Sequence, residues 1–294
     1  MEAIPKESAA AIGQEIRLKY LAVGLRHALR PRNWLSRGAI RKPAIRLYMN
    51  HNTYLRHKPI RKSEIRVFVT HFDDSQLISA SDVKKLLKVD KFLVQNRAIK
   101  LYLIELGIQK KRIQVVYGAV SDKDFCPLKN FSAVVENQVL IVGDCKPRKN
   151  PRLIEAAIRL NQDFNFVIHG KNWENFTNLG VDPTSNVEFL EFNASNHPAL
   201  MRQSMALLSL ATNEGGPFPL LEALASGTPV VATKTGFAPD LIDESNGILL
   251  SMEPSIVEIT NALEACRNLK KSSWAIDMTF GNLSWEELGI KIYK

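Results

Sequence analysis

Short apolar runs rich in β-branched residues alternate with helix-like segments along most of the chain after residue 65. In the first half, strands are predicted at 65–69, 92–94 and 113–117, with helices at 81–87 and 98–106. In the second half, strands are predicted at 139–142, 164–168, 187–192, 206–210, 230–232 and 248–250, with helices at 151–160, 198–203, 218–226 and 254–269. Strands that alternate with helices predict βαβ units and parallel sheets.

A polar stretch that begins at Pro127 separates the two sets of elements. We therefore expect an α/β protein with two doubly wound, Rossmann-like domains facing a cleft. The first and shorter domain would span residues 1–133, and the second residues 134–276. Such sheets bind ligands beyond the carboxyl ends of their strands, so candidate chemistry is sought there.

The segment 8–30 predicts an amphipathic helix in a basic leader of about 45 residues. Its apolar stripe is formed by Ile12, Ile16, Tyr20 and Val23. One interpretation is a peripheral contact of residues 8–42 with an anionic membrane surface. The other is a helix that packs on its own domain and turns a basic face to water.

The net charge of +9 is concentrated in this leader, because residues 1–66 hold fifteen Lys and Arg against four acidic residues. An anionic partner is therefore sought there. No nucleic-acid-binding motif accompanies the charge, which argues against a nucleic-acid partner. Three cysteines without metal-ligand spacing predict no metal site and favour a reducing compartment. With no secretory or membrane-spanning pattern, we expect a cytoplasmic protein.

A basic loop follows the predicted strand 139–142. Gly143 ends the strand, Lys146, Arg148 and Lys149 follow, and Asn150 with Pro151 opens a helix as its cap and first residue. Cations beside a helix N-terminus suit an anion such as a diphosphate. The alternative is a solvated turn with scattered basic residues.

Two glutamates frame the segment that follows the strand 206–210. Glu214 precedes a pair of glycines, which allow close backbone approach to a ligand, and Pro217 is expected to begin a helix. Glu222 lies in the second turn of that helix among leucines and alanines, where an unpaired carboxylate is costly. A ribose diol suits a carboxylate acceptor. Alternatively, Glu222 reaches solvent and Glu214 caps the helix.

Residues 65–294 resemble the family-4 retaining glycosyltransferases. The resemblance rests on the Glu-x7-Glu pair with its continuation EALASGTPVVATKTGFAPDLI, and on the segments VGDCKPRKNP, VVYGAVSDKDFCP and LSWEELGIKIYK. It implies the GT-B fold and transfer of a sugar from a UDP- or GDP-sugar to a glycan or lipid-linked acceptor, as in polysaccharide biosynthesis. It also implies retention of configuration without a metal or other cofactor, and a last helix at 277–294 that crosses back to the first domain.

The resemblance also implies roles for individual residues. Glu222 would hold the donor ribose, Glu214 would contact the sugar hydroxyls, and Lys149 with Arg148 would bind the diphosphate. Backbone groups of Gly143, Gly215, Gly216 and Phe218 would line the donor. His71 follows a strand end and is a candidate sugar contact, or else it is bonded in a local turn with Asp73 or Asp74.

Three positions depart from the family pattern. Asp144 stands where the family has arginine, Pro217 replaces a residue with an N–H group, and Ala119 replaces a glycine. The alternative function is therefore a nucleotide-sugar-binding homologue that has lost turnover.

Overall fold

The computed structural model describes residues 44–56, 63–69, 79–121, 123–128, 134–173, 186–269, 288–289 and 291. Contacts divide the chain into unit 1, formed by Met1–Tyr117 with Trp285–Lys294, and unit 2, formed by Gly118–Ser284. The sequence pattern placed the first division at residue 133. The structure places it earlier because the loop after Tyr117 packs on unit 2.

Two contacts fix that loop to unit 2. A Cβ atom on Gly118, whose φ is +123°, would lie 3.2 Å from side-chain atoms of both Phe218 and Leu221. Farther along, Phe125 is buried, and its ring packs edge to face on the His197 ring with 5.7 Å between the ring centroids. The segment therefore belongs to the core of the second unit.

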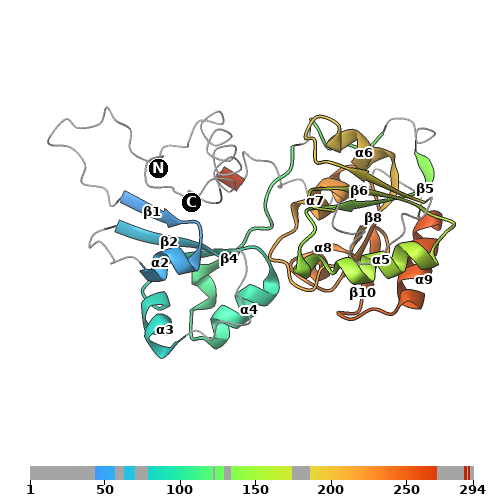
Figure 1. The fold of residues 1–294 in the computed structure, drawn as a ribbon. Helices are drawn as coiled ribbons and strands as arrows, with labels where there is room; N and C mark the ends of the chain where they lie inside the picture. The colour runs from blue at the N-terminus through green and yellow to red at the C-terminus, as the bar shows by residue number, and fades with distance from the viewer. Residues whose placement is uncertain are drawn as a thin grey trace. The chain divides into compact units, whose positions relative to one another are not determined.

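Unit 1 contains a four-stranded parallel sheet in the order β1-β2-β3-β4. The strands are Ala44–Tyr48, Ser63–Val69, Lys91–Val94 and Ile113–Val115, and the connecting helices are α2 (His51–Arg56), α3 (Ala80–Leu86) and α4 (Arg97–Glu105). A short 3-10 turn, Lys110–Arg112, precedes β4. Because the strands follow chain order, right-handed crossovers bring the three helices to the same side of the sheet (Figure 1).

Alternating residues of β2 and β3 form the core beneath these helices. Ile65, Val67, Phe92 and Val94 pack in one cluster with Leu103 of α4. The side chain of Ser79 caps α3 by accepting from the Asp82 amide at 3.2 Å, so the helix begins one residue before the predicted range 81–87. The three predicted strands of the first half are thus present, with small shifts at their ends.

Unit 2 contains a six-stranded parallel sheet in the order β10-β9-β8-β5-β6-β7. The strands in chain order are Val135–Val142, Asn165–His169, Val187–Leu190, Ser204–Ser209, Val230–Thr233 and Gly247–Leu250. The chain begins in the middle with β5, runs outward through β6 to β7, and returns to β8 on the other side. The strand order therefore reverses between β5 and β8, which is where such sheets bind ligands.

Helices cover both faces of this sheet (Figure 1). They are α5 (Pro151–Leu160), α6 (His197–Gln203), α7 (Phe218–Ala225), α8 (Ala238–Leu241) and α9 (Ile256–Asn268). Helix α5 contacts α9, and α6 contacts α7. The larger core lies under α5 and α9, where Ile158 and Leu263 pack with Phe166 and Leu208.

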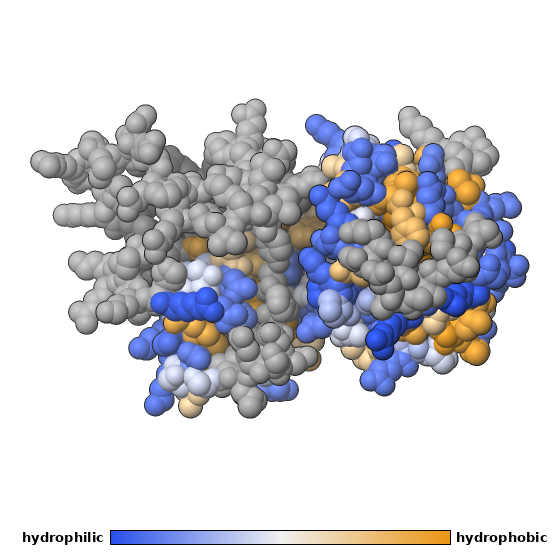
Figure 2. Space-filling model, in the orientation of Figure 1, coloured by the Kyte–Doolittle hydropathy of each residue, from blue (hydrophilic) through white to orange (hydrophobic). Residues whose placement is uncertain are grey.

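Apolar side chains on the surface of unit 2 are scattered, and they include Leu160, Val257 and Met252. Figure 2 shows mostly hydrophilic residues on the visible face of this unit, with separate apolar groups between them. Exposed apolar residues that stand singly are normal on globular proteins. None of the helices in the described segments has the length and apolar character needed to cross a membrane.

Candidate active site

The candidate site lies at the carboxyl edge of the unit 2 sheet. Gly143 follows β5, His169 ends β6, and Glu214 lies in the loop after β8. Because all six strands are parallel, these positions share one edge of the sheet. Sequence positions far apart are thereby brought together.

The loop after β5 requires glycine at two positions. Gly143 has φ +124°, and a Cβ there would lie 3.1 Å from Cε of Lys149. A Cβ on Gly170 would lie 2.0 Å from the Gly143 carbonyl oxygen, so no other residue fits there without a backbone shift. The indole N–H of Trp173 donates to that same carbonyl at 2.8 Å. The loop is thus held close to the end of β6.

The basic residues of the loop form a 3-10 turn, Pro147–Lys149, and α5 then begins at Pro151. Asn150 precedes the helix as predicted, but its φ of +56° is left-handed and its side chain makes no capping bond. Asn150 therefore stands at the predicted cap position, but its side chain does not cap the helix. The left-handed residue instead closes the 3-10 turn, since its N–H donates to the Pro147 carbonyl at 2.9 Å.

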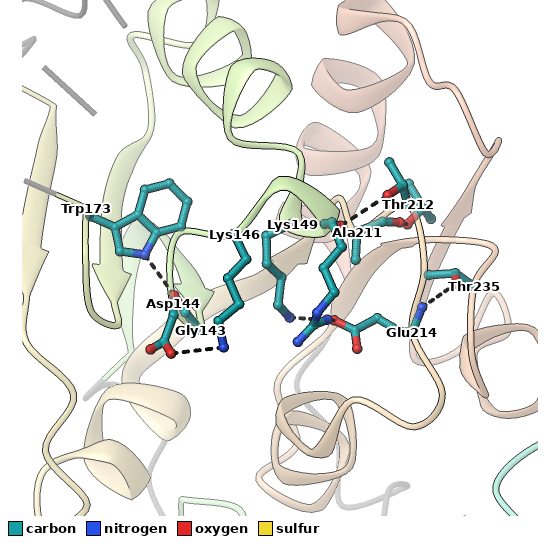
Figure 3. A network of polar contacts seen from close by, with 11 residues as sticks. Gly143, Asp144, Lys146, Lys149, Trp173, Ala211, Thr212, Glu214 and Thr235 are labelled. Carbon is teal, nitrogen blue, oxygen red and sulfur yellow. Dashed lines mark hydrogen bonds and ion pairs between the residues drawn. The ribbon is translucent and has the colours of Figure 1, made fainter. Parts of the chain in front are cut away.

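Lys149 and Glu214 form the centre of the site. Lys149 Nζ lies 2.7 Å from Glu214 Oε1, and the two side chains are only 14% and 10% exposed. Arg148, which is much more exposed, donates from its Nη1 to the same carboxylate oxygen. Figure 3 shows Lys149 and Glu214 pointing toward each other from the loops after β5 and β8. Two cations therefore share one anion, which leaves an excess of positive charge.

Backbone contacts fix the Glu214 loop. The Glu214 amide donates to Thr235 Oγ1 at 2.9 Å, and the Thr212 amide donates to the Arg148 carbonyl at 2.8 Å (Figure 3). Gly236, at φ +61°, would place a Cβ 2.9 Å from the Glu214 carbonyl oxygen. The loops after β5, β8 and β9 are therefore locked to one another around the Lys149–Glu214 pair.

Lys146 lies outside this cluster. Its Nζ pairs with Asp144 at 3.4 Å (Figure 3). The Asp144 carboxylate also accepts from the Lys171 amide at 3.3 Å. Asp144 is the residue that departs from the family pattern. Its carboxylate therefore pairs with Lys146, whereas Lys149 pairs with Glu214.

Helix α7 carries the second glutamate. It begins at Phe218, the predicted first residue, and Pro217 occupies the cap position immediately before it. The Glu222 side chain is 15% exposed, and its Oε2 lies 3.0 Å from His197 Nε2. We expected this carboxylate to have a partner, and the structure confirms it. The partner is His197, which the sequence motif does not include. Gly215 and Gly216 lie between the two glutamates, just before α7.

Two histidines extend the site beyond the sequence motifs. His197 is the first residue of α6, and its Nδ1 lies 3.1 Å from Nδ1 of His169 at the end of β6. Burial lowers the pKa of the His169 imidazole, and the nearby His197 ring lowers it further. A polar residue at the carboxyl end of an otherwise apolar strand was the available signal for His169. His71, the histidine that the sequence indicated as a candidate sugar contact, lies outside the described residues.

Residues 124–273 match the family model described as glycosyl transferases group 1. The match covers half of the chain, and the chain therefore belongs to this family.

One curated relative is an uncharacterized glycosyltransferase of Methanocaldococcus jannaschii, 27% identical over 219 residues. The alignment covers 70% of this chain and 59% of the relative, so this chain spans well under two thirds of the relative's length.

Several solved structures share the fold. One is Anabaena HepE in complex with UDP-glucose, with a TM-score of 0.63, 18% identity, and coverage of 79% of this chain and 71% of HepE. Another is a glycosyltransferase from Rickettsia africae, with a TM-score of 0.64, 16% identity, and coverage of 99% and 82%. The predicted fold class, α/β with two Rossmann-like parallel sheets as in GT-B glycosyltransferases, is confirmed.

Proposed function

We propose that this protein is a retaining glycosyltransferase that moves a sugar from a nucleoside diphosphate sugar to an acceptor hydroxyl. The observation that carries the proposal is the Lys149–Glu214 pair at the strand-order reversal of unit 2, where α/β sheets bind ligands. Family membership supports the same chemistry.

Lys149 and Arg148 are the groups that bind the donor diphosphate in this proposal. Both contact Glu214 in the structure, and a diphosphate carries more negative charge than one carboxylate. The diphosphate therefore competes for the two cations, and Glu214 becomes available to accept from the donor sugar's hydroxyls. When the glycosyl–phosphate bond breaks, negative charge develops on the leaving diphosphate, and fixed cations stabilise that charge. The backbone amides of Gly215, Gly216 and Phe218 add further donors in this proposal.

Glu222 binds the ribose. His197 is hydrogen-bonded to Oε2 of the Glu222 carboxylate. Among the described residues, no other hydrogen-bond partner of this carboxylate is present. Oε1 can then accept from a ribose hydroxyl, and a charged acceptor strengthens such a bond. The relative HepE has been solved with UDP-glucose, which supports a nucleoside diphosphate sugar as the donor class. Both UDP- and GDP-sugars are retained as candidates.

Retention requires that the acceptor oxygen attacks from the face on which the diphosphate departs. Within this proposal the leaving diphosphate accepts the acceptor's proton, so the chain supplies no nucleophile. The reaction proceeds without a metal ion, because Lys149 and Arg148 provide the compensating charge. A glycan or lipid-linked acceptor and a cytoplasmic location complete the proposal.

The basic leader, residues 8–42, is proposed to bring the enzyme to an anionic membrane that holds a lipid-linked acceptor. These residues lie outside the described segments. Each Lys or Arg near an anionic leaflet contributes about 1 kcal/mol, and salt screens the attraction. Liposome sedimentation tests the proposal: attachment should need anionic lipid and fade in high salt. Sedimentation that is unchanged after replacing Arg17, Lys19, Arg26 and Arg30 with Gln would contradict it.

A nucleotide-sugar-binding homologue without turnover is the second candidate. The observation that favours it is Asp144, which pairs with Lys146 and so removes one cation from the phosphate loop. Such a protein would still bind the nucleotide through Glu222 and Lys149.

Release of nucleoside diphosphate from a panel of UDP- and GDP-sugars separates the two candidates. An enzyme should release either UDP or GDP over many turnovers. Proton NMR of the glycosylated product should then show the same anomeric configuration as the donor sugar. Nucleotide binding without turnover would favour the homologue. Inverted product configuration would contradict the retaining mechanism.

A further inference from the structure

Three side chains from three elements form a continuous hydrogen-bonded chain in unit 2. His169 ends β6, His197 begins α6, and Glu222 lies in α7. His169 Nδ1 lies 3.1 Å from His197 Nδ1, and His197 Nε2 lies 3.0 Å from Glu222 Oε2. We name these three residues the relay. Neither histidine belongs to the motifs that indicate the diphosphate and ribose contacts.

A backbone amide determines the direction of every bond in the relay. The Asn193 N–H donates to His169 Nε2 at 3.0 Å, so that nitrogen carries no proton. A neutral His169 must then hold its proton on Nδ1 and donate it to His197 Nδ1. His197 in turn holds its proton on Nε2 and donates it to Glu222. A single pair of neutral tautomers therefore satisfies all three bonds.

Any other protonation state breaks one of these bonds. A proton on His169 Nε2 would face the Asn193 N–H, which places two donors against each other. A doubly protonated His197 would direct Nδ1–H at His169 and force its proton onto Nε2, with the same result. A buried donor left without an acceptor is costly, so the geometry favours this pair of histidine tautomers.

Packing holds the relay in place and keeps water out. His169 is fully buried and His197 is 4% exposed. The Phe192 ring stacks on the His169 ring with 4.9 Å between their centroids, and Phe125 contacts the His197 ring edge to face. The amide that begins the relay is itself fixed, because the Asn193 side chain accepts from the Ser195 amide at 2.9 Å.

We propose that His169 and His197 are positioning residues that hold Glu222 in the orientation needed to accept from the ribose diol. The inference rests on the proposed function, since it assigns the relay to the nucleotide site. His197 fixes Glu222 Oε2 and so directs Oε1 to the ligand. A site built to bind a hydroxyl discriminates against an analogue that lacks it. The relay therefore determines the preference for ribonucleotides over 2′-deoxyribonucleotides.

Calorimetric titration of the full chain tests the relay, with UDP and GDP as probes and their 2′-deoxy forms as matched ligands. His197→Phe keeps an aromatic ring between Phe125 and Phe192 but removes both nitrogens. It should weaken ribonucleotide binding about two- to tenfold, the range for one hydrogen bond, and leave 2′-deoxyribonucleotide binding within about twofold. In a Glu222→Ala background, the same change should have no further effect. His51→Phe, at a buried histidine of unit 1, is the matched control and should bind as the wild type does.

Nitrogen-15 NMR of the histidine rings reads the relay without any ligand. His169 should carry its proton on Nδ1 and His197 on Nε2 at neutral pH. Glu222→Ala should leave His169 in this tautomer, because the Asn193 amide still faces its Nε2.

The outcomes separate the relay from the proposed function. Wild-type protein that binds neither UDP nor GDP but shows both tautomers would overturn the proposed function and the relay's role in it, while confirming the hydrogen-bonded chain. Ribonucleotide binding together with the opposite tautomers would overturn the relay alone. So would a His197→Phe effect that persists in the Glu222→Ala background or that is equal for 2′-deoxyribonucleotides.

Discussion

The two units build similar parallel sheets but use the carboxyl edges of those sheets differently. In unit 1, the residues that follow β3 are the uncharged Gln95 and Asn96, and Asn96 caps α4 by accepting from the Ile99 amide at 2.8 Å. In unit 2, the equivalent edge brings together Lys149, Glu214 and His169. Among the described residues, strand ends serve helix capping in one unit and gather charge in the other.

Charge in unit 1 lies elsewhere, on the strands themselves. Arg66 lies in the middle of β2 and is only 4% exposed. Its Nε lies 2.6 Å from Oε1 of Glu64. The neighbouring Lys91 of β3 has a lowered pKa, because burial and then the Arg66 charge disfavour its protonated form. If the proposed function is correct, donor binding is expected to depend first on the strand ends of unit 2. Each prediction below changes one side of this contrast.

The largest effect is expected from Lys149→Ala, which removes the buried cation of the phosphate loop. Turnover should fall about a hundredfold or more, as when one preorganised group that stabilises developing charge is lost. Arg148→Ala should cost less, because its side chain is 45% exposed and screened by water. Nucleoside diphosphate release measures both, and Lys88→Ala at an exposed position of unit 1 is the control. Equal losses of turnover in Lys149→Ala and Lys88→Ala would contradict a site that depends on the strand ends of unit 2.

Nucleotide should stabilise unit 2 more than unit 1. A ligand at a hundredfold excess over its Kd adds about 2.7 kcal/mol to the stability of the part that binds it. Hydrogen exchange of the full chain, with and without UDP or GDP, measures this by segment. The amides of β5, β6 and β8 should gain more protection than those of β2 and β3. Equal protection in both sheets would contradict a site that depends mainly on unit 2.

Acid should destabilise unit 2 through His169. Its folded pKa is lowered from 6.5, so above pH 6.5 both the folded and unfolded states are neutral and this destabilising contribution is absent. As the pH falls, the unfolded state takes up the proton first, and stability is lost until the folded pKa is passed. Urea unfolding at pH 7.5 and pH 5.5 should show the loss. His169→Phe should reduce the pH dependence, and an unchanged dependence would show that other groups cause it.

The smallest change is expected from Thr235→Val, which removes the acceptor of the Glu214 amide. The loss of one hydrogen bond costs about 1 kcal/mol, and the loop keeps its other contacts. Turnover should therefore fall severalfold, far less than with Lys149→Ala. Thr212→Val, which leaves the backbone bond to Arg148 intact, should have even less effect. A hundredfold loss from Thr235→Val would mean that this loop, rather than the cations, limits the reaction.

Much of the fold could be predicted from the sequence because the unit 2 strands contain apolar runs, and β5, β6 and β9 are bordered by glycine or proline. The strands and helices of the second half are present close to their predicted positions. Strand β1 and helix α2 were not predicted from the sequence. In α2 only His51 and Tyr54 are buried, so the segment HNTYLR has too weak an apolar stripe to indicate a helix.

The candidate site was predictable only where its residues lie close together along the chain. Motif spacing indicated Lys149, Glu214 and Glu222, but not that Glu214 binds Lys149 directly. Pairing of that kind depends on the order of strands, since β5 and β8 are neighbours only through a long crossover. The same reason hides the contact between His197 and Glu222. Local pattern specifies elements, whereas topology specifies which strand ends meet.

Calorimetric titration of the full chain with UDP and GDP, on wild type and Glu222→Ala, is the most direct test of the nucleotide site in unit 2. We expect one of the two nucleotides to bind with one site per chain. Glu222→Ala should weaken it by about 1.5–3 kcal/mol, the range for a hydrogen bond to a charged group. Glu264→Ala, at an exposed carboxylate of α9, is the matched control and should bind like the wild type. Binding of neither nucleotide by folded wild-type protein, or equal affinity in Glu222→Ala, would contradict the site.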